Sequence, residues 1–165
     1  MTVTDLLNRA RDLGVMIATA ESCTGGLVAA ALTDIPGSSS VVERGFVTYT
    51  NLAKQEMLGV KLTTLDAHGA VSEQVAQEMA EGALSHAPVH LTVSITGIAG
   101  PGGSEHKPEG RVCFGLSGRG IDTQVETIEF GAIGRDNVRL KARNHALTLL
   151  HKGLLRIGEK RGDTA

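Results

Sequence analysis

The chain has 165 residues, of which 41% are hydrophobic and 21% are charged, a balance typical of one globular domain with its own core. The formal net charge of −2 gives no general attraction to nucleic acid. Aromatic residues are scarce, with one Tyr, three Phe and no Trp, which argues against a surface that stacks single-stranded bases. No apolar run approaches the roughly 20 residues that cross a bilayer, and the N-terminus lacks the pattern of a signal peptide. We therefore expect a cytoplasmic protein without a nucleic-acid or membrane partner.

The sequence contains no metal-binding motif and no cofactor-binding motif. The two cysteines, Cys23 and Cys113, form no CxxC pair, and the six His residues show no HxH or HExxH spacing. Walker A and GxGxxG patterns are also absent. We expect reduced thiols, no metal and no cofactor.

Apolar periodicity and turn residues predict alternating helices and strands in one domain over residues 1–165. The predicted helices span residues 3–13, 25–32, 51–58, 71–84 and 135–157. The predicted strands span residues 15–20, 46–49, 89–96, 111–116 and 123–130. The last two strands are close enough in sequence for an antiparallel hairpin. This order predicts an α/β fold, a three-layer α/β/α sandwich with a mixed, mostly parallel sheet and a frayed tail at 158–165.

Small hydroxyl and thiol side chains follow the first predicted strand, at Ser22, Cys23 and Thr24, before Gly25 and Gly26. The next helix begins here, and its first N–H groups are free and carry a partial positive charge. One role is structural, since Ser and Thr are favoured helix caps. The other is chemical, with Ser22 as a nucleophile or the backbone N–H groups holding an anion or oxyanion. Cys23 is an alternative nucleophile, although a small buried Cys is the commoner role.

A second candidate cluster contains Tyr49, the only Tyr of the chain, and Lys54. Lys54 stands about one helical turn into the predicted helix that starts at Asn51, its possible cap, so its ammonium could reach back toward the strand end. A lysine serves as a general base where burial or a nearby cation lowers its pKa. A solvated Lys and a half-buried Tyr are the structural alternative.

The third cluster is a glycine-rich segment, residues 95–104, that leaves another predicted strand. Its bare backbone N–H groups could wrap a phosphate or a polar ring substituent, or the segment could be a mobile loop. Arg135, Arg139 and Arg143 recur at spacing four on the last helix, as a solvated face or as phosphate ligands. Because ligands of open α/β sheets bind outside the carboxyl ends of strands, we expect the three clusters to meet at one edge.

The chain resembles the CinA C-terminal family in short segments that run in order over nearly its whole length. They are TAESCTGG (19–26), PGSS (36–39), VTYTNLAK (47–54), LGV (58–60), GAVS (69–72), TGIAGP (96–101) and KPEG (107–110). Two departures concern the glycine-rich segment: it is one residue shorter than is common after Pro101, and Glu109 replaces a small apolar residue.

The resemblance implies a three-layer α/β/α domain and an amidohydrolase. Enzymes of the family convert nicotinamide mononucleotide to nicotinate mononucleotide and ammonia, a step of pyridine nucleotide salvage. By motif position, Ser22 is the nucleophile, Lys54 its base, and Tyr49 assists. Substrate-binding residues by the same reasoning are Cys23, Thr24, Gly25, Thr96, Gly97, Ile98 and Arg139, the last through the phosphate. We expect a small-molecule substrate and, as is common for enzymes of this size, a homo-oligomer.

Two other functions stay open at this point. In the first, the chain is a non-catalytic module that binds a nucleotide or phosphate, as in competence- or damage-inducible CinA proteins. In the second, Cys23 replaces Ser22 as the nucleophile of a hydrolase.

Overall fold

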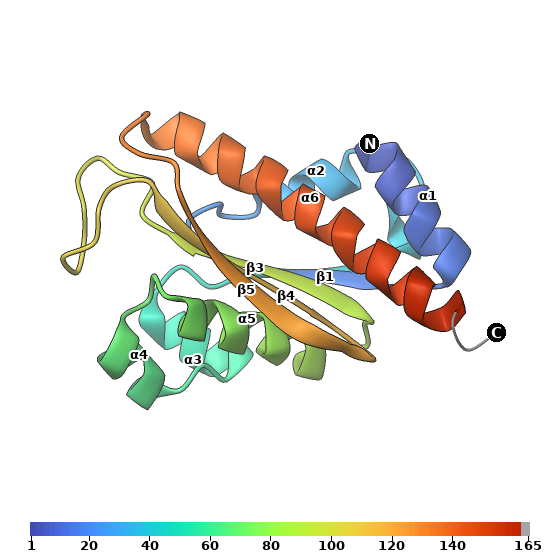
Figure 1. Ribbon diagram of the computed structural model, residues 1–165, viewed down its shortest axis with the longest axis horizontal. Coiled ribbons are helices and arrows are strands. Elements are labelled where there is room, and N and C mark those ends of the chain that lie inside the picture. Colours follow the sequence, from blue (N-terminus) through green and yellow to red (C-terminus); the bar gives the residue numbers. More distant parts are fainter. Residues whose placement is uncertain (163–165) are drawn as a thin grey trace.

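A five-stranded sheet lies between two layers of helices in the computed structural model, which describes residues 1–162 (Figure 1). The strands are β1 (Ile17–Glu21), β2 (Val42–Val47), β3 (Leu91–Gly97), β4 (Arg111–Gly118) and β5 (Ile121–Glu129). The helices are α1 (Val3–Leu13), α2 (Leu27–Thr33), η1 (Ser38–Ser40), α3 (Asn51–Leu58), α4 (Leu62–His68), α5 (Glu73–His86) and α6 (Arg135–Gly162).

The strand order is β2-β1-β3-β4-β5. Strand β1 pairs in parallel with β2 and β3, whereas β4 is antiparallel to both β3 and β5. Four strands therefore point in one direction and β4 in the other. The predicted mixed, mostly parallel sheet and the predicted hairpin of its last two strands are confirmed.

Each face of the sheet is covered by three helices. Helices α1, α2 and α6 lie on one face, and α3, α4 and α5 lie on the other (Figure 1). Helix α5 approaches the sheet closely at Gly115 on β4, where a Cβ atom would lie 2.5 Å from the backbone oxygen of Ala76. A side chain at Gly115 would separate the two layers, which explains the glycine in this strand interior.

Several element boundaries differ from the predicted ones. Strand β2 begins at Val42 rather than at residue 46, and the short helix α4 has no counterpart in the sequence analysis. Thr50, not Asn51, caps α3, since its side chain accepts a hydrogen bond from the N–H of Ala53. Helix α6 continues to Gly162, so residues 158–162 of the expected frayed tail are helical, and the rest of that tail lies outside the described residues.

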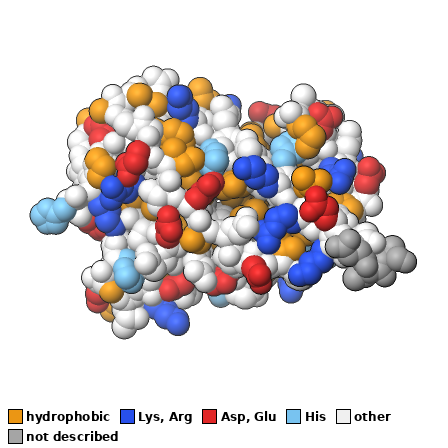
Figure 2. Space-filling model, viewed as in Figure 1, with side chains coloured by type: hydrophobic (Ala, Val, Ile, Leu, Met, Phe, Trp, Pro, Cys, Tyr) orange, Lys and Arg blue, Asp and Glu red, His pale blue; other side chains and the backbone are white. Residues whose placement is uncertain are grey.

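The surface carries both signs of charge. Acidic and basic side chains are interspersed over the face seen in Figure 2, in keeping with the formal net charge of −2. Among the helices of residues 1–162, none is both long and apolar enough to cross a membrane.

Candidate active site

The three parallel strands end side by side and place their following residues around one cavity. Glu21 at the end of β1 is in register with Val47 on β2 and with Ile95 on β3. A cavity of about 290 Å³ opens at this edge. It is lined by Ser22, Cys23, Tyr49, Asn51, Lys54, Ala70, Val71, Thr96, Ser104, Arg135 and residues 97–103. The three clusters thus meet where the rule for open α/β sheets places a ligand.

The side chains of Ser22 and Lys54 meet at the base of this cavity. Lys54 Nζ lies 3.1 Å from Ser22 Oγ, a hydrogen-bond distance. The same nitrogen donates to the backbone oxygens of Thr48, at 3.1 Å, and Tyr49, at 3.3 Å. Two backbone carbonyls and one serine hydroxyl therefore surround the Lys54 amine. These contacts keep the amine oriented toward Ser22.

Lys54 is almost completely buried, with 1% of its surface exposed. Burial disfavours the charged ammonium and lowers the pKa of Lys54 from its ordinary value of 10.5, against weaker opposing effects of Cys23 and Glu105. A larger fraction of this amine is therefore neutral near neutral pH than for a solvated lysine. A neutral amine beside a serine hydroxyl is the arrangement that general-base activation of the serine requires.

A buried carboxylate shapes the turn that carries Ser22. Glu21 is fully buried, and its two oxygens accept hydrogen bonds from the hydroxyls of Thr19 and Thr24 and from the N–H groups of Val28 and Ala29. Since the N-cap of α2 is a glycine without a side-chain cap, Glu21 takes over the capping of that helix. Its negative charge also stands at the favourable end of the helix dipole.

Cys23 is a poor nucleophile in this setting. Its side chain is buried, and burial raises the pKa of the Cys23 thiol to about 12. Because the thiolate is the reactive form of cysteine, the thiol is nearly unreactive at neutral pH.

The end of β3 and the loop that follows form another wall of the cavity. Thr96, Gly97 and Ile98 line it. The Thr96 hydroxyl donates to the backbone oxygen of Ala70, at 2.8 Å. At Gly97 a Cβ atom would lie 2.7 Å from the side chain of Val112, so only glycine fits between β3 and β4 at this point.

Of the two arginines at the start of α6, the structure places Arg135, not Arg139, on the cavity wall. Arg139 Nε donates to the backbone oxygen of Cys23, at 3.0 Å, and a terminal nitrogen contacts that of Thr24, at 3.4 Å. Arg139 therefore braces the Ser22 turn. Arg135 donates to the backbone oxygen of Gly100 and to the hydroxyl of Tyr49, both at 2.7 Å.

Most of the predicted site residues line the cavity, and three do not. Thr24 and Gly25 belong to the turn behind the wall, and Arg139 contacts that turn from α6, so none of the three is part of the lining itself. The site residues that the resemblance implies do not include Asn51 or Arg135, although both line the cavity. The signal for Arg135 was its place at the head of the basic series on the last helix.

Among residues 1–162, no three His, Cys, Asp or Glu side chains gather in a way that could hold a metal ion.

Comparisons with known proteins agree on one family. The model of the CinA C-terminal domain matches residues 2–154. A relative in Escherichia coli K12, named nicotinamide-nucleotide amidohydrolase PncC, is 52% identical over 146 residues, which cover 86% of this chain and 86% of the relative. A CinA-like protein of Chlorobium phaeobacteroides is also 52% identical over 146 residues, but this chain spans only 34% of its length.

Solved structures give the same result. The crystal structure of a competence/damage inducible protein, CihA, from Agrobacterium tumefaciens superimposes with a TM-score of 0.85 at 48% identity, over 91% of this chain and 94% of that one. Because both its sequence and its fold match, the chain belongs to the CinA C-terminal domain family.

Proposed function

We propose that the chain is an amidohydrolase that converts nicotinamide mononucleotide to nicotinate mononucleotide and ammonia through a Ser22–Lys54 dyad. The observation that carries this proposal is the 3.1 Å contact between Ser22 Oγ and the buried Lys54 Nζ. A relative of similar length, 52% identical over 86% of this chain, bears the name nicotinamide-nucleotide amidohydrolase, which supports the choice of substrate.

The first step is attack by Ser22 on the carboxamide carbon. A neutral Lys54 amine has two N–H bonds and one lone pair. The carbonyls of Thr48 and Tyr49 take the two N–H bonds, so the lone pair faces Ser22 Oγ. Lys54 accepts the hydroxyl proton as the new C–O bond forms, and the carbonyl oxygen becomes an oxyanion.

The Ser22 turn supplies candidate donors for that oxyanion. The N–H groups of Ser22 and Gly25 are already bonded, to the backbone oxygens of Ile95 and Ser22. Within the described residues, the N–H groups of Cys23 and Thr24 have no backbone acceptor. We assign the oxyanion to these two groups, which the Glu21 and Arg139 contacts hold in place.

The second half of the reaction returns the proton and releases the acid. The Lys54 ammonium donates its proton to the departing amide nitrogen as the C–N bond breaks, and ammonia leaves an ester on Ser22. Water then attacks this ester with Lys54 as base. The C–O bond to Ser22 breaks, the serine recovers its proton, and the carboxylate product is free to leave.

We assign the substrate's phosphate to Arg135 rather than to Arg139. Arg135 lines the cavity, and its guanidinium could exchange the Gly100 and Tyr49 contacts for phosphate oxygens. Tyr49 exposes 57% of its surface at the same place, so its side chain belongs to the opening of the cavity. Its backbone oxygen, which binds Lys54, is its contribution to the dyad.

The rate of hydrolysis should rise with pH and then level off. Protonated Lys54 has no lone pair and cannot accept the Ser22 proton, so kcat is lost as the pH falls through the pKa of Lys54. Since burial lowers that pKa, the midpoint of the rise should lie below 10.5. The measurement is kcat for ammonia release from nicotinamide mononucleotide between about pH 5 and pH 10.

Two results of that measurement would count against the proposal. A kcat that is flat or falls over the range where Lys54 loses its proton would contradict the base role. Nicotinamide mononucleotide that binds and is recovered unchanged at every pH would favour the non-catalytic binding module.

A further inference from the structure

The glycine loop, residues 98–110 between β3 and β4, is firmly held at its base. The N–H of Ile98 donates to the backbone oxygen of Arg111, at 2.9 Å, and the N–H of Gly110 donates to that of Ile98, at 2.7 Å. The cavity wall, however, is built from residues 97–104, which extend beyond this base. What holds the far part of the loop therefore determines the shape of the cavity.

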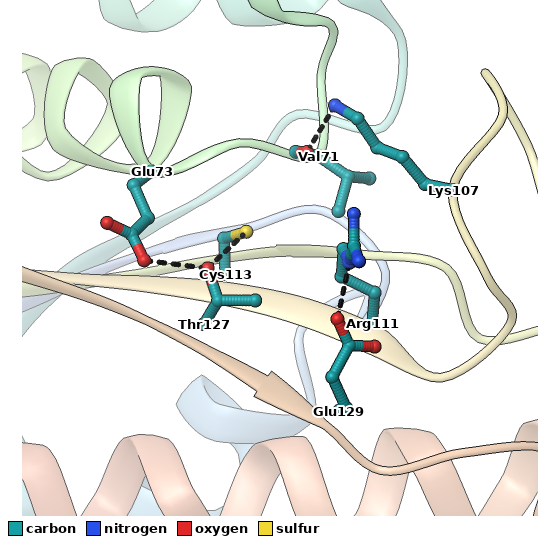
Figure 3. A network of polar contacts seen from close by, with 7 residues as sticks. All are labelled: Val71, Glu73, Lys107, Arg111, Cys113, Thr127 and Glu129. Carbon is teal, nitrogen blue, oxygen red and sulfur yellow. Dashed lines mark hydrogen bonds and ion pairs between the residues drawn. The ribbon is translucent and has the colours of Figure 1, made fainter.

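Lys107 ties that far part to the other side of the cavity. Its Nζ donates to the backbone oxygens of His68 and Val71, each at 2.6 Å. Figure 3 shows the Lys107 side chain reaching from the loop to Val71, which precedes α5. Val71 itself lines the cavity, so this contact joins two of its walls directly.

A tight turn couples Lys107 to the lining residue Ser104. The N–H of Ser104 donates to the backbone oxygen of Lys107, at 3.1 Å, and the reverse bond measures 2.8 Å. The two residues between them, Glu105 and His106, have φ angles of 52° and 63°. This left-handed conformation is uncommon for residues other than glycine, and the paired hydrogen bonds between Ser104 and Lys107 hold the turn in it. The position of the Lys107 backbone therefore fixes that of Ser104.

Two other side chains, Glu109 and Arg135, form hydrogen bonds with the glycine loop. Glu109 accepts a hydrogen bond from the N–H of Gly102, which stiffens the loop internally. Arg135 donates to Gly100, but we assign the same arginine to the phosphate. Within residues 1–162, Lys107 and Arg135 are the two side chains that tie residues 99–108 to elements outside the loop by hydrogen bonds. Lys107 is the one that substrate binding leaves in place.

We propose that Lys107 is a positioning residue that fixes the glycine loop against the segment between α4 and α5 and so sets the substrate-binding wall of the cavity. An ammonium group suits this task because it has three donors and no acceptor, and can serve two carbonyl oxygens at once. The proposal rests on the proposed function. The role of Lys107 is separate from the chemistry of the dyad, because Lys107 contacts neither Ser22 nor Lys54.

Replacement of Lys107 by Met should weaken substrate binding and spare the chemical step. We expect KM for nicotinamide mononucleotide to rise about tenfold with kcat within about twofold of wild type, because the wall contributes to substrate and transition state alike. Lys107→Arg, which keeps donors for two carbonyls, should recover most of the loss. Lys141→Met, at an exposed position on α6, is the matched control and should leave both constants unchanged.

A second readout does not depend on turnover. Glu105 follows the tight turn's first residue and is exposed, so endoproteinase Glu-C can report how well the loop is held. Cleavage after Glu105 should be about tenfold faster in Lys107→Met than in wild type and Lys141→Met, since cleavage follows local opening.

The outcomes separate the two proposals. Wild type that fails to hydrolyse the nucleotide overturns the proposed function, while faster Glu-C cleavage of Lys107→Met still supports the anchoring of the loop. Wild-type KM together with wild-type cleavage in Lys107→Met overturns the role of Lys107. A fall in kcat at unchanged KM also overturns it, because the residue would then act on the dyad.

Discussion

Replacement of Lys54 by Met should lower kcat for ammonia release by about 10² to 10⁴-fold, the usual contribution of a positioned general base. Methionine has a similar length and suits a position with 1% exposure, but it has no lone pair for the Ser22 proton. Lys54→Arg should fail to a similar degree, because arginine stays protonated and its guanidinium cannot act as a base. The measurement is steady-state kinetics with nicotinamide mononucleotide at the pH of maximal wild-type activity.

Lys61→Met provides the control for this experiment. Lys61 is exposed just before α4, and its removal should leave kcat unchanged. Circular dichroism shows whether each variant is folded, and so distinguishes the loss of the general base from unfolding. A Lys54→Arg variant that is folded and as active as wild type would show that the lysine acts only through its charge.

The second large effect is expected at Glu21, and it is an effect on stability. Truncation to Ala removes the acceptor of two buried donors, the hydroxyl of Thr24 and the N–H of Val28, and of one partly buried donor, the N–H of Ala29. Unsatisfied buried donors cost about 1–3 kcal/mol each, so we expect Glu21→Ala to lower the free energy of unfolding by about 3–5 kcal/mol. The melting temperature should fall by about 10 °C, as measured by thermal denaturation.

Two further variants test whether this loss comes from the capping of α2. Glu21→Gln keeps one acceptor oxygen and should lose less stability than Glu21→Ala. Glu56→Ala removes an exposed carboxylate from α3 and should change the melting temperature little. If Glu21→Ala had the same melting temperature as Glu56→Ala, the buried carboxylate would not be the group that stabilises the Ser22 turn.

Much of this fold is readable in the sequence where local signals and burial agree. Helix α1 has the predicted bounds because Thr2 and Asp5 form a capping box and Gly14 ends the helix in the left-handed region. The meeting of Ser22 and Lys54 also agrees with the sequence analysis, since Ser22 directly follows a strand, Lys54 is in the first turn of the helix after the neighbouring strand, and the ends of parallel strands share one edge.

The predicted element boundaries are wrong where tertiary contacts, and not local sequence, determine the secondary structure. Strand β2 is at the sheet edge and has Glu43, Arg44 and Gly45 in its middle, so its first half shows no apolar alternation. Helix α4 buries a single residue, Leu65, and is held by hydrogen bonds from its first turn to Glu78 on α5. Contacts of this kind leave no periodic pattern in the sequence.

The placement of Arg135, and not Arg139, on the cavity wall also depends on tertiary packing. Residues four apart share one face of a helix but stand about 6 Å apart along its axis. Sequence spacing therefore places both arginines on one face of α6. Which arginine stands at the cavity and which at the Ser22 turn depends on how far α6 slides along the sheet, which only the packed structure shows.

In the proposed reaction Ser22, and not Cys23, is the nucleophile of an amidohydrolase. The most direct test is ammonia release from nicotinamide mononucleotide by wild type, Ser22→Ala and Cys23→Ala, with EDTA present to suppress contaminating metal-dependent hydrolases. We predict release by wild type and by Cys23→Ala, and none above background by Ser22→Ala. Release by Ser22→Ala at the wild-type rate, or its loss only in Cys23→Ala, would contradict the assignment of Ser22 as the nucleophile.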